Sequence, residues 1–224
     1  MTMKIFDLLS HLLFPEKCIL CNRILKGEES DLCHDCRINE PQCPILSDKY
    51  PFIDRWTALW YYEDTVRGSL LRYKFHGKRH YAQAYGRLLA MKLVREERVD
   101  FDILTWVPVG DKRRRKRGFD QVELLAEGLG IALGYTPQKL LKKIRNNPPQ
   151  SGIVGAAQRR ANVLGAYQVL RPELVAGRRI LLLDDIITTG ATAGECARVL
   201  LTAGATEVQF AVVAAARQHK KVSR

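Results

Sequence analysis

One stretch of the sequence, residues 180–192, constrains the fold more than any other. It begins with four consecutive aliphatic residues, Ile180 to Leu183, which are typical of a strand buried on both faces of a sheet. Asp184 and Asp185 close this run, and small hydroxyl residues and a glycine follow. Residues 193–203 then have helical apolar spacing and end at Gly204. The stretch therefore predicts a strand, a short turn and a helix in direct succession.

The turn after the two carboxylates suits a phosphate group. Free backbone N–H groups and the positive end of the helix dipole meet at such a junction. Thr188, Thr189 and Thr192 add hydroxyl donors, and Gly190 lets the backbone approach an anion closely. The carboxylates would repel phosphate, so they suit sugar hydroxyls and a Mg²⁺ ion held with the substrate. The sequence therefore predicts a site for a phosphorylated sugar. An ordinary buried strand followed by a capped helix is the structural alternative.

Four cysteines near the N-terminus predict a structural zinc site. Cys18 and Cys21 form one Cys-x-x-Cys pair, and Cys33 and Cys36 form a second pair after an intervening segment, residues 22–32. Two such pairs at this separation supply four thiolates to one tetrahedral ion. Disulfides are one alternative, which a chain without an export signal does not favour. A redox Cys-x-x-Cys motif is another, but it would not explain two copies of the pair. His34 lies inside the second pair and is a possible substitute ligand.

The charge of the chain favours anionic partners. Its formal net charge is +12, and six basic residues follow one another at positions 112–117. This run comes directly after a predicted strand, residues 101–107, so we expect a cationic loop beside the ligand site. Part of the run suits pyrophosphate, and the remainder suits nucleic acid; a solvated surface is the structural alternative.

The other segments alternate between strand and helix patterns. Further strands are expected at 56–62, 166–170 and 207–215, and further helices at 63–74, 81–97, 120–133 and 156–162. Residues 139–155 are basic and then rich in proline and glycine, and we expect a mobile loop over the site. This order predicts a parallel sheet flanked by helices, with ligands at the carboxyl ends of the strands.

We expect two domains and a cytoplasmic location. Residues 1–45 are predicted to form a short amphipathic helix and a zinc-ribbon module, and residues 46–224 the α/β domain. No apolar run approaches the length of a membrane span, which argues against membrane attachment. The N-terminal apolar segment contains Asp7 and lacks a small-residue cleavage site, so it is not a secretory signal.

Several segments together resemble the ComF/GntX-type phosphoribosyltransferase-like family, which is linked to competence. Residues 180–192 match the PRPP-binding motif of type I phosphoribosyltransferases at every position. The other segments that carry the resemblance are the cysteine pairs, Tyr73-Lys74-Phe75-His76-Gly77, Val107-Pro108-Val109, Arg117-Gly118-Phe119-Asp120-Gln121, Arg145 with Gln150, and Arg159-Arg160-Ala161-Asn162. The resemblance implies a type I phosphoribosyltransferase fold with an N-terminal zinc ribbon.

The resemblance also implies roles for individual residues. The PRPP loop would comprise Asp184, Asp185, Ile186, Thr188, Thr189, Gly190, Ala191 and Thr192, with the carboxylates on ribose and the loop on the 5′-phosphate. The pyrophosphate loop would comprise Val109, Gly110, Asp111 and Lys112. Lid or anion contacts would come from Arg117, Arg145 and Gln150, and Mg²⁺ would accompany PRPP.

Two positions depart from the family pattern. Family members usually have Asn where this chain has Asp120, so no detailed role follows for that position. Many members carry a second cysteine set, of which Cys43 alone remains here. We therefore expect a single zinc ion, and the role of Cys43 stays open.

Two functions remain open from the sequence, and a third possibility is that the zinc module is a docking site for a partner protein. The first is an enzyme that transfers phosphoribosyl from PRPP to an acceptor, although no residue stands out as a general base. The second is a non-catalytic accessory factor that binds single-stranded DNA or a DNA-uptake or replication protein, and uses the fold only to bind PRPP or a nucleotide.

Overall fold

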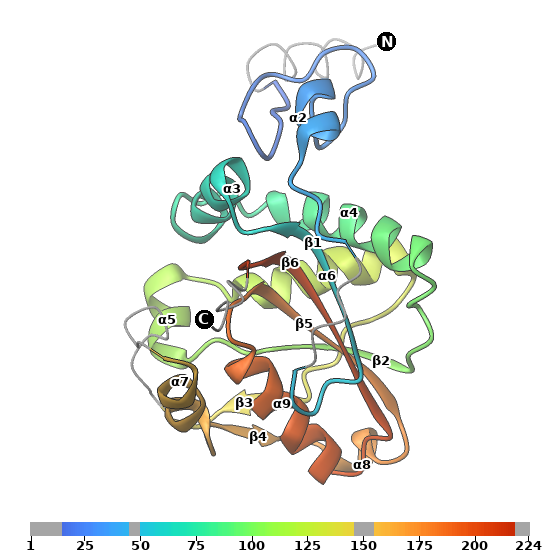
Figure 1. The fold of residues 1–224 in the computed structure, drawn as a ribbon, viewed down its shortest axis with the longest axis vertical. Helices are drawn as coiled ribbons and strands as arrows, with labels where there is room; N and C mark the ends of the chain where they lie inside the picture. Colours follow the sequence, from blue (N-terminus) through green and yellow to red (C-terminus); the bar gives the residue numbers. More distant parts are fainter. Residues whose placement is uncertain (1–14, 45–49, 146–154, 218–224) are drawn as a thin grey trace, which may run out of the picture.

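In the computed structural model of this chain, residues 15–44, 50–145 and 155–217 are described (Figure 1). The predicted N-terminal helix at 1–14 and Gln150 lie outside these ranges. None of the helices within them is long and apolar enough to cross a membrane.

A parallel sheet forms the centre of the molecule. Its strands lie in the order β1 (Arg55–Tyr61), β6 (Glu207–Ala215), β5 (Arg179–Ile187) and β2 (Ile103–Trp106). All three pairings are parallel, and Asp184 in β5 lies opposite Val212 in β6. The aliphatic runs in β5 and β6 are buried because helices cover both faces of the sheet. The predicted parallel α/β architecture is confirmed.

Helices α4 (Tyr81–Arg95) and α6 (Gln121–Leu133) cover one face, next to α3 (Asp64–Phe75) (Figure 1). The opposite face packs against α9 (Ala191–Thr202) and a small antiparallel sheet of β3 (Leu141–Lys143) and β4 (Tyr167–Val169). Helices α7 (Ala156–Val163) and α8 (Pro172–Val175) complete this side.

Strand β5 divides its side chains between the two faces. Leu181 and Leu183 pack in the core formed with α4 and α6, whereas Ile180 and Leu182 pack in the core formed with α9. This alternation is the period of two that every strand imposes. The next two residues of the strand, Asp184 and Asp185, therefore also point to opposite faces of the sheet.

Three predictions about local structure are wrong. Strand β5 does not end at the carboxylates but pairs with β6 as far as Ile187, because β6 continues beside it. The six basic residues form helix α5 (Asp111–Arg117) rather than a loop. Lysine and arginine are good helix formers, and Gly118, with φ of 77°, ends the helix in the left-handed conformation.

The third error concerns the loop expected at residues 139–155. Its first part contains strand β3, which pairs with β4 from Leu141 opposite Val169 to Lys143 opposite Tyr167. The apolar content of this segment is low, so its strand character depends on the partner strand. Residues 146–154 of that loop lie outside the described residues.

The cysteine module packs against α3 and α4. Cys33 precedes α2 (His34–Asn39), and the buried residues Ile19, Leu20 and Leu32 belong to the same apolar core as α3 and α4. Arg72 of α3 donates a hydrogen bond of 3.0 Å to the carbonyl oxygen of Ile19. The module therefore shares a core with the body of the protein, and the boundary expected between residues 45 and 46 stays a prediction.

Candidate functional site

A cleft of about 960 Å³ opens at the carboxyl ends of β2 and β5. Segments far apart in the sequence line it, including the turn after β5, the loop after β2, and parts of α3, α5 and α7. The predicted site residues that line it are Val109, Gly110, Arg117, Asp184, Asp185, Ile186, Thr188, Thr189, Gly190, Ala191 and Thr192. The structure thus brings most of the residues that the sequence singled out into one cavity.

The turn between β5 and α9 forms an open amide cradle, defined as residues 188–192. Gly190 precedes α9 with φ of 72°, a left-handed conformation that favours glycine. Within the described part of the chain, no acceptor receives a hydrogen bond from the N–H groups of these residues. Thr188 is exposed, and Thr189 and Thr192 are half-buried. The cradle therefore presents free donors at the start of a helix, where an anion is favoured.

Tyr50 supports the cradle from behind. A Cβ atom added to Gly190 would lie 2.1 Å from Cδ1 of the Tyr50 ring. Tyr50 is itself buried and packs edge-on against Trp56, with ring centroids 5.2 Å apart. Position 190 therefore requires glycine for its backbone conformation and for lack of space.

The two carboxylates differ in their surroundings. Asp185 is buried, with Oδ1 2.8 Å from the ammonium of Lys74 and Oδ2 accepting a 3.1 Å hydrogen bond from the amide nitrogen of Gln121. Asp184 is half-buried, and its Oδ1 accepts the backbone N–H of Asp185 at 2.8 Å. Burial, reinforced by the negative charge of Asp185, raises the pKa of Asp184 well above its usual range.

Positive charge dominates the rest of the cleft. Its cationic lining consists of Lys74, Arg79, Arg113, Lys116, Arg117, Lys143 and Arg159. These residues far outnumber the two carboxylates, so the cavity suits a ligand with several negative charges. Burial lowers the pKa values of Arg117 and Lys143, and the neighbouring charge of Arg113 acts in the same direction.

Not every predicted anion contact faces the cleft. Asp111 and Lys112 are exposed in the first turn of α5 and do not line it. Arg145 is exposed, and its guanidinium donates a hydrogen bond of 3.0 Å to the carbonyl oxygen of Leu164. Arg159 of α7 is the cation near the cradle instead, with its guanidinium 3.5 Å from the hydroxyl of Thr188.

Asp120 links the loop after β2 to helix α6. Its Oδ1 caps the helix by accepting the N–H groups of Val122 and Glu123, and its Oδ2 accepts the N–H of Val109 at 3.0 Å. One carboxylate thus orders both the start of a helix and a wall of the cleft.

Sequence reasoning did not assign Lys74 and Gln121 to the site, although both lie in segments that carried the family resemblance. Each is the polar residue of its segment that reaches Asp185. The available signal is their position at the end of one predicted helix and at the start of another. The fold that brings both helices to the carboxyl end of β5 is what places them.

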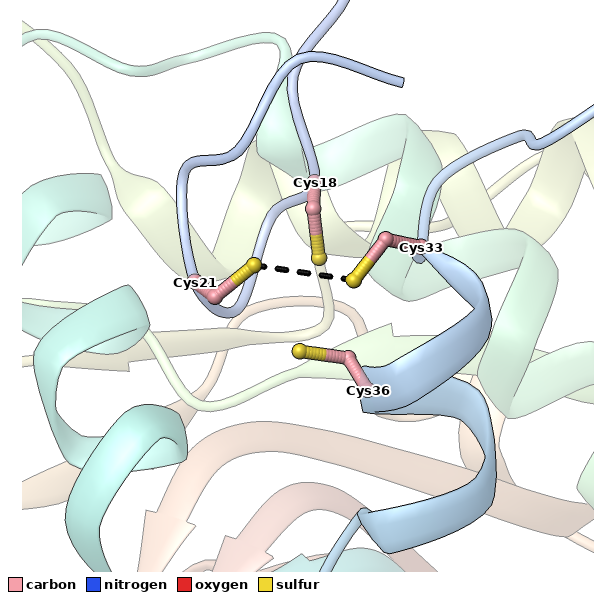
Figure 2. Close-up of side chains that lie close together, drawn as sticks. All are labelled: Cys18, Cys21, Cys33 and Cys36. Carbon is pink, nitrogen blue, oxygen red and sulfur yellow. Dashed lines mark hydrogen bonds between the residues drawn. The ribbon is translucent and has the colours of Figure 1, made fainter. Parts of the chain in front are cut away.

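The four predicted zinc ligands converge at one point (Figure 2). Their Sγ atoms all lie within 4.8 Å of one another, and those of Cys21 and Cys33 are 3.6 Å apart. A tetrahedral zinc ion with Zn–S bonds of about 2.3 Å requires sulfurs about 3.8 Å apart. The cluster therefore fits a zinc ribbon. Cys43 is buried outside it, and burial raises the pKa of its thiol to about 11.

Comparisons with known proteins find a matching family model and similar relatives. A family model described as "Phosphoribosyl transferase domain" matches residues 116–224. The competence protein ComFC of Streptococcus pneumoniae is 28% identical, over 86% of this chain and 97% of that protein. The DNA utilization protein YhgH of Escherichia coli is 27% identical, over 86% of this chain and 87% of that protein.

A solved structure also aligns with part of the chain. It is the glutamine phosphoribosylpyrophosphate amidotransferase from B. subtilis, with 24% identity and a TM-score of 0.43. The alignment covers 63% of this chain and 30% of that one.

Proposed function

Because this chain belongs to the ComF-type phosphoribosyltransferase-like family, we propose that its cleft binds PRPP, or a closely related phosphorylated pentose, together with Mg²⁺. The observation that carries the proposal is the amide cradle of residues 188–192, whose free N–H groups lie beside two carboxylates in an otherwise cationic cavity. The similarity to a competence protein and to a DNA utilization protein supports a role for this binding in DNA uptake or utilization.

The cleft offers a different partner to each part of such a ligand. The cradle and the dipole of α9 suit the 5′-phosphate, and the carboxylate end of β5 suits the sugar hydroxyls. Arg113, Lys116 and Arg117 of α5 suit the pyrophosphate. In a transfer reaction these cations would stabilise the negative charge that develops as pyrophosphate leaves.

The residues present also fit a magnesium ion. Mg²⁺ usually takes one or two protein carboxylates and completes its shell with substrate phosphates and water. Because both oxygens of Asp185 already have protein donors, Asp184 is the carboxylate open to the ion. Bound there, Mg²⁺ would neutralise charge on the pyrophosphate.

Calorimetric titration with PRPP and Mg²⁺ tests the proposal, and α9 offers a matched pair of variants. Thr192→Val removes a cradle hydroxyl at the start of the helix, and we expect about tenfold weaker binding because a hydrogen bond to a charged phosphate is lost. Thr202→Val removes an exposed hydroxyl at the far end of the same helix and should leave binding unchanged. A wild-type protein that does not bind PRPP contradicts the proposal.

Catalysis requires its own test, because binding alone does not imply transfer. We expect an active enzyme to release pyrophosphate from PRPP and Mg²⁺ when the right nucleobase or amine acceptor is supplied. Binding without release across a broad acceptor panel would favour a ligand-sensing role.

A second candidate function, single-stranded DNA binding, is favoured by the charges on α5. Lys112, Arg114 and Arg115 are exposed and lie outside the cleft lining, so they remain accessible to another polyanion. Their combined replacement by Gln should weaken DNA binding and flatten its salt dependence, while PRPP affinity is retained. DNA affinity that does not change with salt would exclude this function.

A further inference from the structure

Helix α3 contacts both the cysteine module and the cleft. Ser69 and Arg72 donate hydrogen bonds to the module, and Lys74 lines the cleft near the end of the same helix. Positions 69 and 74 lie only about 8 Å apart along the helix axis. The two sets of contacts therefore belong to one short element, and a movement of that element affects both.

The contacts with the module fall inside the first Cys-x-x-Cys pair. Ile19 and Leu20 are the two residues between its cysteines. Nη2 of Arg72 donates to both of their carbonyl oxygens, at 3.0 Å and 2.5 Å, and the hydroxyl of Ser69 donates to that of Ile19. The backbone of this pair must hold a fixed turn for its two thiolates to reach one ion. Metal binding and these hydrogen bonds therefore favour the same conformation.

The last turn of α3 makes the contacts at the cleft. The ammonium of Lys74 lies 2.8 Å from Oδ1 of Asp185, and the two side chains are 15% and 7% exposed. Gln121 at the start of α6 donates to Oδ2 of the same carboxylate at 3.1 Å. The hydroxyl of Tyr73 donates to the backbone carbonyl of Gln121. Helix α3 thus holds both the carboxylate and the start of α6 beside the cleft.

A buried chain of contacts joins the two ends of this arrangement. Ser69, Tyr73 and Tyr85 are each 0% exposed. Because the hydroxyl hydrogen of Ser69 is used on Ile19, Tyr85 of α4 is the donor in the 2.6 Å bond between the two hydroxyls. The ring of Tyr85 packs edge-on against that of Tyr73, with centroids 5.5 Å apart. A densely packed interior transmits a displacement rather than absorbing it.

We propose that metal binding in the cysteine module and ligand binding in the cleft are coupled through α3, with Arg72 as the positioning residue. In the metal-bound module, the carbonyls of Ile19 and Leu20 hold α3 where Lys74 meets Asp185. Without metal this turn is no longer fixed, and α3 loses a support. By linkage, a ligand in the cleft strengthens metal binding by the same factor. The inference rests on the proposed function for its ligand and adds regulation of that site.

Calorimetric titration of the whole chain with PRPP and Mg²⁺ tests the coupling. It compares the zinc-loaded protein with protein from which a chelator has removed zinc and has itself been dialysed away. We expect about tenfold weaker PRPP binding without zinc, a usual factor for coupled sites. Arg72→Met should bring the two affinities close together, since Ser69 alone then holds the turn. Equal affinities in the wild type overturn the inference.

Arg87→Met is the matched control. Arg87 also joins the module to the body, through its ion pair with Asp31, but it extends from α4 rather than from the helix that carries Lys74. This variant should keep the full difference between the two forms. Arg72→Lys keeps a donor for the carbonyls and should restore part of the difference. If Arg87→Met removes the difference as Arg72→Met does, the assignment to α3 is wrong.

The reciprocal measurement uses the zinc-loaded protein, so it does not depend on how well the zinc-free chain folds. Competition with a colorimetric chelator gives the zinc affinity, with a protein-free blank at the same PRPP concentration. Saturating PRPP and Mg²⁺ should raise the affinity about tenfold in the wild type and much less in Arg72→Met. If the wild type binds no PRPP in either form, the proposed function fails and the inference falls with it. If it binds PRPP while neither affinity depends on the other ligand, the inference alone fails.

Discussion

Gly190 shows how closely the fold constrains a single residue beside the cleft. Two independent features exclude a larger residue at position 190. The positive φ disfavours any residue with a Cβ atom, and the Tyr50 ring occupies the space where that Cβ would lie. We expect the neighbouring N–H groups to stay available to an anion only while this conformation is kept. At the residue scale, the phosphate-binding role that we propose for the cradle therefore depends on one glycine and one aromatic ring.

The replacement Gly190→Ala separates these two effects when it is compared with Gly134→Ala. Gly134 has a similar φ of 76° but open space where a Cβ would lie. We expect Gly134→Ala to lower the free energy of unfolding by about 1–2 kcal/mol through backbone strain alone. Gly190→Ala should lose about 1–3 kcal/mol more, because Tyr50 must move. Equal losses in urea denaturation would mean that the Tyr50 contact is unimportant.

The raised pKa of Asp184 predicts the direction in which the stability of the protein changes with pH. Its pKa is raised in the folded protein, so its charge opposes folding at neutral pH, and stability rises as the pH falls from 7 toward the unfolded-state value of 3.8. Asp184→Asn removes this opposition and should raise the urea midpoint at pH 7. The gain should shrink at pH 5.

The control for Asp184 is Glu127→Gln, which changes the same formal charge on an exposed position of α6. It should leave the midpoint unchanged at both pH values. A lower midpoint for Asp184→Asn at pH 7 would show that its carboxylate stabilises the fold.

At the scale of elements, the cleft lies where the end of β5 meets the N-terminal ends of α9 and α6 and the cationic helix α5. Strand β5 supplies the carboxylates, α9 the cradle, α5 a row of cations, and α6 the cap residue Asp120. Asp120 connects two of these elements, because its carboxylate joins the start of α6 to the backbone of Val109. This gives a physical role to a position at which the chain departs from the pattern of the family that it resembles.

Replacing Asp120 by Ala should destabilise the protein by about 1–2 kcal/mol, because the N-cap bonds of α6 are lost. It should also free the N–H of Val109 and raise the exchange rate of that amide with solvent. Glu63→Ala is the comparison, since Glu63 precedes α3 without a side-chain cap bond. Hydrogen exchange at Val109 that stays as slow as in the wild type would contradict the link.

Much of the fold was predictable from sequence because strong local signals agreed with the tertiary structure. The buried run at 180–183 and the apolar stretch at 207–215 identify β5 and β6 by composition alone. The helical state of the basic run was missed because charge repulsion and helix propensity compete, and solvent exposure weakens the repulsion. Lys74 was missed because its partner is 111 residues away.

At the scale of the whole molecule, the cysteine module and the α/β body form one structure. Ile19, Leu20 and Leu32 share an apolar core with Leu70 and Tyr85 of the body. Arg87 of α4 also makes a 2.5 Å ion pair with Asp31 of the module. A metal that orders the module would therefore also stabilise α3 and α4, and the end of α3 lines the cleft.

Metal removal tests this coupling. Dialysis against a chelator should lower the thermal midpoint and speed amide exchange in α3 and α4, because the module loses its ligand-bound geometry. Added Zn²⁺ should restore both. A midpoint that is the same before and after chelation would show that the four cysteines fold without metal.

The central claim is that the backbone amides of residues 188–192 hold the phosphate of a pentose. Amide NMR of the labelled protein tests this most directly, with PRPP and Mg²⁺ added stepwise. We predict that the largest shifts occur at the N–H groups of Thr188, Thr189, Gly190 and Thr192, with saturation at one equivalent. Unchanged signals from these amides, together with shifts elsewhere in the chain, would contradict the account.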